Sequence, residues 1–237
     1  MNKIYPSLVA IVPAAGVGSR MEADRPKQYL TLDGRFILDV TIEKLLSCAL
    51  VSQVIVAVSA DDPYFSKLSM ANHPKVLRVD GGVERADSVL NGLNKALALG
   101  AQWALVHDAA RPCLLVDDIE RLLEQVAADD DGGLLAAPVR DTMKRASPDG
   151  FVDHTVNREG LWHALTPQLF PTKSLQRNVA AALAANIPVT DEASAMEWAG
   201  HHPKLVIGND TNIKVTRPAD LKLAGFYLQH EDNLGCA

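Results

Sequence analysis

The residues best suited to chemistry lie in a glycine-rich segment near the N-terminus. The small residues 13–19, PAAGVGS, are followed at once by Arg20, and Lys27 comes seven residues later. Small residues let the main chain approach an anion closely, and its N–H groups can then donate to that anion. Arg20 and Lys27 add positive charge that backbone amides lack. The pattern therefore predicts a binding site for a polyphosphate.

Two common phosphate-binding motifs do not match this segment. The dinucleotide pattern G-x-G-x-x-G requires a third glycine where this chain has Met21, and the Walker A pattern is absent. A glycine-rich turn with solvated cations would explain the loop equally well if it stood alone. The positions of Arg20 and Lys27, the latter after a proline, favour phosphate.

A second group of candidate residues ends a predicted strand at His107-Asp108. A carboxylate there suits Mg²⁺, which usually takes one or two carboxylates together with substrate phosphates. The competing interpretation is that Asp108 caps the next turn, which is the commoner role of a lone aspartate. We expect His107 to be packed or hydrogen-bonded, and Arg111 either to pair with Asp108 or to face a phosphate.

Other charged candidates lie in the second half of the chain. Lys214 occupies a strand-like run at 213–215, so it needs a partner, either Asp210 or a ligand phosphate, because an unpaired buried charge is costly. Thr142 and Arg158 flank a polar segment and either bind an anion or belong to a solvated arm. Neither a Ser/His/Asp nor a Cys/His arrangement is evident, so nucleophilic catalysis is not indicated.

Strands and helices alternate from residue 8 to residue 139, and they must position these groups. Apolar runs predict strands at 8–12, 53–58, 75–79, 103–106 and 133–139, with helices at 37–50, from about 63 to 70, before Gly100, and at 117–128. For the last of these, Asp117 and Glu120 resemble a capping box. The alternation predicts an α/β fold with a doubly wound, mostly parallel sheet. Ligands of such sheets bind beyond the carboxyl ends of the strands, so we expect loops 14–27, 81–88 and 107–111 to converge.

The alternation stops after residue 139. The polar segment at about 140–157, with a turn at 147–150, predicts a β-hairpin arm. A hairpin this polar is not stable by itself, and a second copy of the chain is the simplest partner. Further helices are predicted at 172–185 and 191–199, strands at 204–207 and 213–215, and a last helix after Thr216. We expect one domain over 1–237, with the arm as an excursion.

Composition narrows the class of protein. The 237 residues carry a net charge of −6, with 48% apolar and 22% charged residues, so a general nucleic-acid surface is not expected. Cys48, Cys113 and Cys236 are far apart and fit neither a disulfide framework nor a zinc site. A reducing cytoplasm is the expected compartment. No signal peptide and no stretch of membrane-spanning length is found, so no membrane association is expected.

Several motifs in order resemble one enzyme family over nearly the whole chain. They are AAGVGSRM, RPKQ, GGVERADSV, HDAARP, PVRDTMK, TVNREGLWHALTPQ, TDEASAMEW and NIKVTRP. Together they resemble the 2-C-methyl-D-erythritol 4-phosphate cytidylyltransferases. The resemblance implies a nucleotidyltransferase that joins CTP to methylerythritol phosphate in the non-mevalonate isoprenoid pathway, with release of pyrophosphate and with Mg²⁺ or another hard divalent cation.

The resemblance also implies roles for single residues. Arg20, Lys27 and Lys214 would be the catalytic cations. The CTP site would be lined by Ala14, Ala15, Gly16, Gly18, Gly82 and Ser88, with Asp108 at the ribose and the metal and Asp210 assisting the metal. The methylerythritol phosphate site would include Thr142, Arg158, Thr166 and Thr190. The family is homodimeric, and the arm of one subunit would help to build the substrate site of the other.

Three other functions compete with this interpretation. A cytidylyltransferase acting on ribitol 5-phosphate would use the same cations with a different acceptor pocket. A non-catalytic nucleotide-binding regulator is disfavoured because Arg20, Lys27, Asp108 and Lys214 are all retained. An NAD-dependent dehydrogenase is disfavoured by Met21 in place of glycine.

Overall fold

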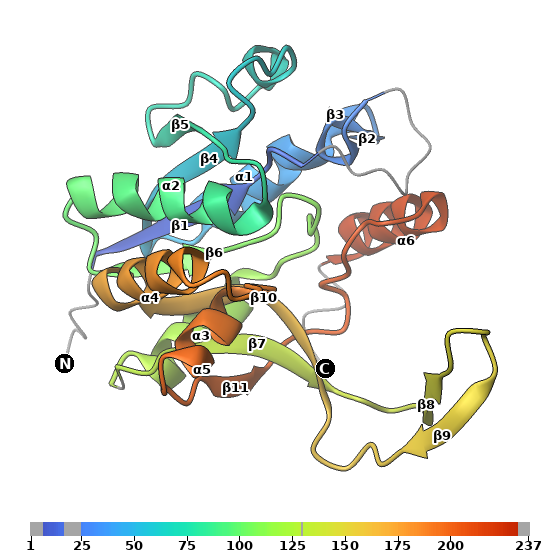
Figure 1. Ribbon diagram of the computed structural model, residues 1–237. Helices are drawn as coiled ribbons and strands as arrows, with labels where there is room; N and C mark the ends of the chain where they lie inside the picture. The colour runs from blue at the N-terminus through green and yellow to red at the C-terminus, as the bar shows by residue number, and fades with distance from the viewer. Residues whose placement is uncertain (1–6, 17–24, 129, 232–237) are drawn as a thin grey trace.

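The computed structural model has a seven-stranded sheet at its centre, with the strand order β11-β7-β10-β6-β1-β4-β5 (Figure 1). The structure describes residues 7–16, 25–128 and 130–231. Gly18 and Arg20, two of the predicted site residues, therefore lie outside the described residues. The α/β class and the mostly parallel sheet predicted from the sequence are confirmed.

Four parallel strands form one half of the sheet. They are β1 (Leu8–Pro13), β4 (Val51–Val58), β5 (Val76–Asp80) and β6 (Trp103–Val106). β1 pairs with β6 on one side and with β4 on the other, and β4 pairs with β5. The apolar runs that predicted β1, β4 and β6 are largely buried on both faces, as expected for parallel strands covered by helices, whereas β5 at the sheet edge is partly exposed.

The other half of the sheet contains a strand that the sequence analysis missed. β10 (Trp162–Pro171) runs antiparallel between β6 and β7 (Gly133–Pro138), and β11 (Lys204–Ile207) lies parallel to β7 at the edge. Proline is rare within a central strand because it has no N–H to donate, so Pro167 obscured the pattern. The pairing of β10 with β7 is irregular between Ala164 and Gln168, and this irregularity accommodates Pro167.

Helices cover both faces of the sheet. α2 (Arg85–Ala98), α4 (Thr172–Ala184) and α5 (Glu192–Trp198) share one apolar cluster, which includes Ile11 of β1. α1 (Ile37–Ser47) and α3 (Val116–Val126) share another, which includes Ala10. Alternate residues of β1 thus face opposite layers, which is the arrangement of a doubly wound sheet.

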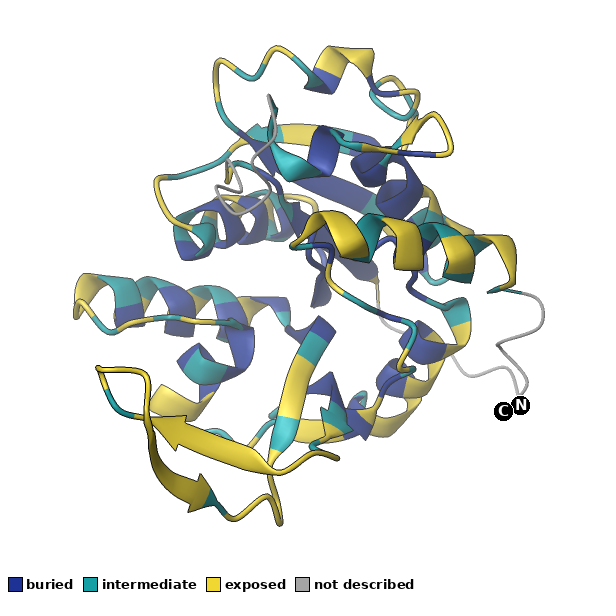
Figure 2. Cartoon of the chain, turned by 90° about the vertical axis from the view of Figure 1, so that its right-hand side faces the viewer, coloured by how far each residue is buried: buried dark blue, intermediate teal, exposed yellow. Residues whose placement is uncertain are grey.

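Smaller elements surround these layers. β2 (Thr31–Leu32) and β3 (Arg35–Phe36) form a short ribbon beside α6 (Pro218–Gln229). β8 (Met143–Ala146) and β9 (Val152–Val156) pair as an antiparallel hairpin that projects away from the sheet (Figure 1). Nearly every residue of this hairpin is exposed (Figure 2). Within the described part of the chain, no helix has the length and apolarity needed to cross a membrane.

Three local predictions are wrong. The helix expected at about 63–70 is only a 3-10 turn, Phe65–Lys67. The strand expected at 213–215 is a loop, because Val215 N donates a single bond to Ala110 O instead of joining a ladder. Asp117 does not cap α3: the helix follows Leu115, and the carboxylate of Asp118 instead accepts from Asn209 N at 3.1 Å.

Candidate active site

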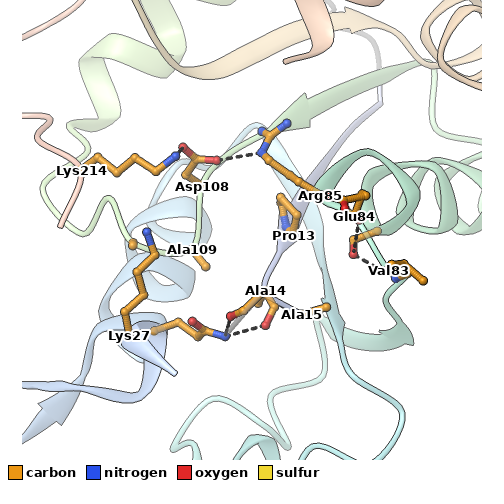
Figure 3. A pocket seen from close by; sticks show the side chains of 15 residues that line it. Pro13, Ala14, Ala15, Lys27, Val83, Glu84, Arg85, Asp108, Ala109 and Lys214 are labelled. Atoms are coloured by element: carbon orange, nitrogen blue, oxygen red, sulfur yellow. Dashed lines mark hydrogen bonds and ion pairs between the residues drawn. The ribbon is translucent and has the colours of Figure 1, made fainter. Parts of the chain in front are cut away.

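A cavity of about 160 Å³ lies at the carboxyl ends of β1 and β6 (Figure 3). Each of the loops 14–27, 81–88 and 107–111 contributes to its wall, so the predicted convergence of these loops is confirmed. The predicted site residues that line it are Ala14, Ala15, Gly16, Lys27, Gly82, Ser88, Asp108 and Lys214.

Gln28 holds the described part of the first glycine loop in place. Its side-chain amide donates to Ala14 O at 2.7 Å and to Gly16 O at 3.1 Å, and the residue is buried. Both carbonyls are therefore satisfied by Gln28. Its neighbour Lys27 directs its ammonium group into the cavity (Figure 3). The sequence analysis did not assign a role to Gln28, although it belongs to the RPKQ motif.

The second glycine loop lies against the first. A Cβ atom at Gly81 would lie 2.5 Å from the Cβ of Ala15, so only glycine permits this approach. The buried Ser88 hydroxyl accepts from Gly82 N at 3.0 Å and fixes the turn where α2 begins. Val83 points outward at the rim of the cavity and is 96% exposed.

Asp108 is surrounded by three cations. Lys214 Nζ lies 2.8 Å from Oδ2, Arg85 Nε lies 3.1 Å from Oδ1, and Arg111 Nε lies 3.6 Å from Oδ2. Burial alone would raise the pKa of Asp108, but the charges of Arg85, Lys214 and Arg111 outweigh it and hold that pKa well below its ordinary value. Asp108 is thus a permanent anion. Of the two roles predicted for Arg111, it takes the structural one and pairs with Asp108.

Arg85 connects Asp108 to a second buried carboxylate. Its Nη1 lies 2.7 Å from Glu192 Oε1 and its Nη2 lies 3.2 Å from Oε2, while Nε contacts Asp108. Burial raises the pKa of Glu192, and Arg85 opposes that rise. Sequence reasoning missed both residues. They lie within the GGVERADSV and TDEASAMEW motifs, and their place in these motifs was the only available signal.

His107 is packed and hydrogen-bonded, as predicted. Asp108 N donates to Thr166 Oγ1 at 3.1 Å, Thr166 Oγ1 lies 3.0 Å from His107 Nδ1, and His107 Nε2 lies 3.0 Å from Arg111 O. Because the carbonyl can only accept, Nε2 carries the proton, and Nδ1 accepts from the threonine hydroxyl. Burial lowers the pKa of His107 to about 4, so the ring is neutral at pH 7.

The partner predicted for Lys214 was only partly right. Lys214 has an anionic partner, as predicted, but that partner is Asp108. The side chain of Lys214 is 39% exposed rather than buried. Asp210 pairs instead with Arg140, at 2.7 Å between Nη2 and Oδ2, and it does not line the cavity. The reason is the loop at 213–215, which directs Lys214 toward the end of β6.

None of the four predicted acceptor residues lines the cavity. Thr166 is buried beside Asp108, and Thr190 is exposed just before α5. Thr142 and Arg158 flank the exposed hairpin and are absent from the cavity lining. The Arg158 guanidinium donates to Arg140 O.

The described residues do not build a complete protein cage for a metal ion. No group of three or more His, Cys, Asp or Glu side chains within residues 7–16, 25–128 and 130–231 is arranged to hold one. Asp108 is a permanently ionised carboxylate at the cavity wall. This donor set fits Mg²⁺ only where phosphate oxygens supply most of the ligands.

Comparison with known proteins agrees with this geometry. The family model described as 2-C-methyl-D-erythritol 4-phosphate cytidylyltransferase matches residues 8–230. A protein of that name from Vibrio parahaemolyticus is 58% identical over 232 residues, covering 98% of this chain and 99% of the relative.

Two solved structures are also similar. A crystal structure of 4-diphosphocytidyl-2C-methyl-D-erythritol synthase has a TM-score of 0.83 and 37% identity, and covers 95% of this chain and 100% of its own. The Francisella tularensis 2-C-methyl-D-erythritol 4-phosphate cytidylyltransferase has a TM-score of 0.79 and 35% identity, with coverage of 93% and 99%. The chain therefore belongs to the 2-C-methyl-D-erythritol 4-phosphate cytidylyltransferase family.

Proposed function

We propose that the cavity at the ends of β1 and β6 binds the triphosphate of CTP and transfers its cytidylyl group to 2-C-methyl-D-erythritol 4-phosphate. The products are 4-diphosphocytidyl-2-C-methyl-D-erythritol and pyrophosphate. The observation that carries the proposal is that Lys27 and Lys214 line one cavity between two glycine loops. Backbone N–H groups and cations in such a loop are suited to a nucleoside triphosphate.

The reaction needs positioning and charge more than proton transfer. A phosphate oxygen of the acceptor attacks the α-phosphorus of CTP in line, and the bond to the pyrophosphate oxygen breaks. The attacking phosphate carries little proton at neutral pH, so no general base is required. His107 is consistent with this, because it is neutral and committed to internal hydrogen bonds.

The catalytic roles proposed for the cations follow from this charge. Lys27, Lys214 and Arg20 would neutralise the charge that grows on the α-phosphate and the leaving pyrophosphate. An ammonium group has three donors, so Lys214 can keep Asp108 and still donate to a phosphate oxygen. Lys214 must make both contacts at the same time, to Asp108 and to the phosphate, if Asp108 is to stay charged beside the nucleotide.

The glycine loops would hold the rest of CTP. Main-chain groups of Ala14, Ala15, Gly16 and Gly18 would contact the phosphates, and Gly82 with Ser88 would lie at the base. Asp108 would face the ribose. Mg²⁺, bound by Asp108 and triphosphate oxygens, would supply further positive charge at the phosphates. Asp210, paired with Arg140, is the weaker candidate for a metal ligand.

We further propose that two copies of the chain build each acceptor site. Thr166 and Thr190 of one chain would bind methylerythritol phosphate together with Thr142 and Arg158 from the hairpin of the other. Support comes from the exposure of the hairpin, which includes the apolar Phe151 at 75% exposed.

The buried free thiols of Cys48 and Cys113 suit a reducing cytoplasm.

The proposed function is tested by measuring pyrophosphate release. All four nucleoside triphosphates are combined in turn with methylerythritol phosphate and with ribitol 5-phosphate. We expect release only with CTP and methylerythritol phosphate. Equal or faster turnover with ribitol 5-phosphate would reassign the acceptor, and no release with any pair would remove the catalytic function.

Lys27 provides the sharpest single variant. Because it faces the phosphates, Lys27→Ala should lower kcat about 10²- to 10³-fold, the cost typical of a lost transition-state contact. Lys173→Ala, which removes an exposed lysine on α4, is the matched control and should keep wild-type turnover. Normal kcat in the Lys27 variant would exclude this residue from the mechanism.

A further inference from the structure

Glu192 is a buried carboxylate that lies outside the cavity lining. It begins α5, is 1% exposed, and has both oxygens occupied by Arg85 at 2.7 and 3.2 Å. A buried carboxylate is expensive unless it is paired in good geometry. The planar guanidinium of Arg85 matches two carboxylate oxygens at once, which a lysine does not do.

The pairing with Glu192 also determines what Arg85 offers to Asp108. With Nη1 and Nη2 directed to Glu192, the guanidinium presents Nε to Asp108 Oδ1 at 3.1 Å. Arg85 therefore lies between two carboxylates and is fixed at both ends (Figure 3 shows the Asp108 end). If Glu192 were neutral, its carbonyl oxygen could still accept from Arg85, but one N–H group of the fork would be available for Asp108 or for a phosphate.

These contacts close a ring through β10. Asp108 N donates to Thr166 Oγ1 at 3.1 Å. On the same strand, Gln168 Oε1 accepts from Ala193 N at 2.8 Å and Gln168 Nε2 donates to Asp191 Oδ2 at 2.9 Å. Residues 166–168 thus hold Asp108 at one end and the start of α5 at the other, while Glu192 and Arg85 join the two directly.

We infer that Glu192 is a positioning residue that holds Asp108 through Arg85 and so couples the segment 190–192 to the nucleotide site. The inference rests on the proposed function, in which Thr190 contacts the acceptor. Thr190, where the acceptor would bind, is two residues before Glu192 in the chain. A displacement of Glu192 would move Arg85, and Arg85 would in turn move Asp108. The acceptor and CTP then bind with mutual dependence.

The arrangement has a consequence when CTP is bound. Lys214 contacts Oδ2 of Asp108. When it also donates to a phosphate oxygen, its interaction with that carboxylate is weakened. Arg85 contacts the other oxygen through Nε, while its Nη1 and Nη2 are occupied by Glu192. Asp108 therefore keeps its position while Lys214 serves the reaction.

The test compares Glu192→Gln with Glu197→Gln in the full-length protein. Glu197 is exposed on the same helix, so its variant loses the same formal charge without touching Arg85. Binding of α,β-methylene-CTP, which cannot transfer its cytidylyl group, is measured by calorimetry with and without saturating methylerythritol phosphate. Thermal unfolding and pyrophosphate release with CTP are measured on the same preparations.

We expect the acceptor to tighten binding of the analogue in the wild type and in E197Q, and this ratio to approach one in E192Q. Turnover at saturating CTP should fall about 10-fold or more in E192Q, in the range seen when a group that orients an active-site ligand is removed. A purely structural role would lower the unfolding temperature and leave the ratio unchanged. An unchanged ratio in folded E192Q, or no dependence in the wild type, overturns the inference.

Arg85→Lys decides the question if E192Q does not fold. This variant keeps the charge but cannot bridge both carboxylates with a fork, so it should lose the same dependence on acceptor. A wild-type ratio in R85K overturns the inference. Wild-type protein that releases no pyrophosphate would instead refute the proposed function, and the inference with it.

Discussion

Asp108 and its partners illustrate how far single residues could be predicted from the sequence. The need of Lys214 for an anion follows from the cost of an unpaired charge, and the sequence analysis predicted it. The identity of the anion does not follow, because it depends on a loop that carries Lys214 past Asp210 to the end of β6. Arg85 and Glu192 were missed for the same reason, since only the folded chain brings the first turn of α5 to the first turn of α2.

Gln28 offers a test of the first loop at this scale. In Gln28→Glu, a carboxylate would face Ala14 O and Gly16 O without a hydrogen to donate, leaving two acceptors unsatisfied. The expected penalty of about 1–3 kcal/mol should raise the KM for CTP and leave that for the acceptor nearly constant. Steady-state kinetics measure both, with exposed Gln125→Glu on α3 as the control. Equal rises in both KM values would contradict the assigned role.

His107 predicts a dependence of stability on pH. Its pKa is about 4 in the folded protein against an ordinary value near 6.5, so the unfolded chain binds a proton more readily between those values. Stability from this group is complete above pH 6.5 and is lost as the pH falls toward 4, by about 3 kcal/mol. Urea unfolding at pH 7.5 and pH 4.5 measures it. The loss should be smaller by that amount in His107→Gln, and an equal loss in both proteins would contradict the burial of a neutral ring.

At the scale of elements, strands were predictable where burial on both faces produced a continuous apolar run. β6 has the predicted ends, and β4 begins slightly earlier than predicted. β10 was not predictable in this way, because its first half is partly exposed, its second half is buried, and Pro167 interrupts the pattern. The convergence of the three loops was predicted correctly, because it requires only that each loop follow the carboxyl end of a strand in a parallel sheet.

Gly92 tests the packing between α2 and β1. A Cβ at this position would overlap Cγ2 of Ile11, so Gly92→Ala should lower the free energy of unfolding by about 1–3 kcal/mol despite the helical preference of alanine. Gly225→Ala on α6 meets no atom within 4 Å and should instead stabilise by up to about 1 kcal/mol. Urea unfolding of both variants gives the comparison. Stabilisation by both would show that α2 adjusts freely.

At the scale of the whole molecule, the feature that demands explanation is the hairpin of β8 and β9. Its side chains are exposed, and Thr142 and Arg158 at its base lie outside the cavity of their own chain. The sequence analysis predicted a hairpin here from its polar pattern and its turn. Whether a second chain receives it depends on a surface formed only after folding, which no local pattern encodes.

Mixed dimers test the proposed sharing of sites between two copies of the chain. Lys27→Ala and Arg158→Ala should each be nearly inactive alone, because one disables the site of its own chain and the other the hairpin given to its partner. Random mixing by co-refolding should restore about a quarter of wild-type pyrophosphate release, since half of the dimers then contain one intact site of two. Mixing Lys27→Ala with Lys214→Ala is the control. It should restore no pyrophosphate release, because each change disables the site of the chain that carries it and neither mixed site is intact. No recovery in the first pair would exclude shared sites.

The position of β10 constrains the order in which the protein can assemble during synthesis. β7 is made before β10 but is separated from β6 in the finished sheet by β10 itself. A ribosome-bound chain that has exported only the first 140 residues can pair β6 with β1 but not with β10, its neighbour on the other side. The strand that joins the two halves of the sheet also carries Thr166 and Gln168, which hold Asp108 and the start of α5. The growing chain thus acquires the strand between β6 and β7 and the contacts that hold Asp108 from the same late segment.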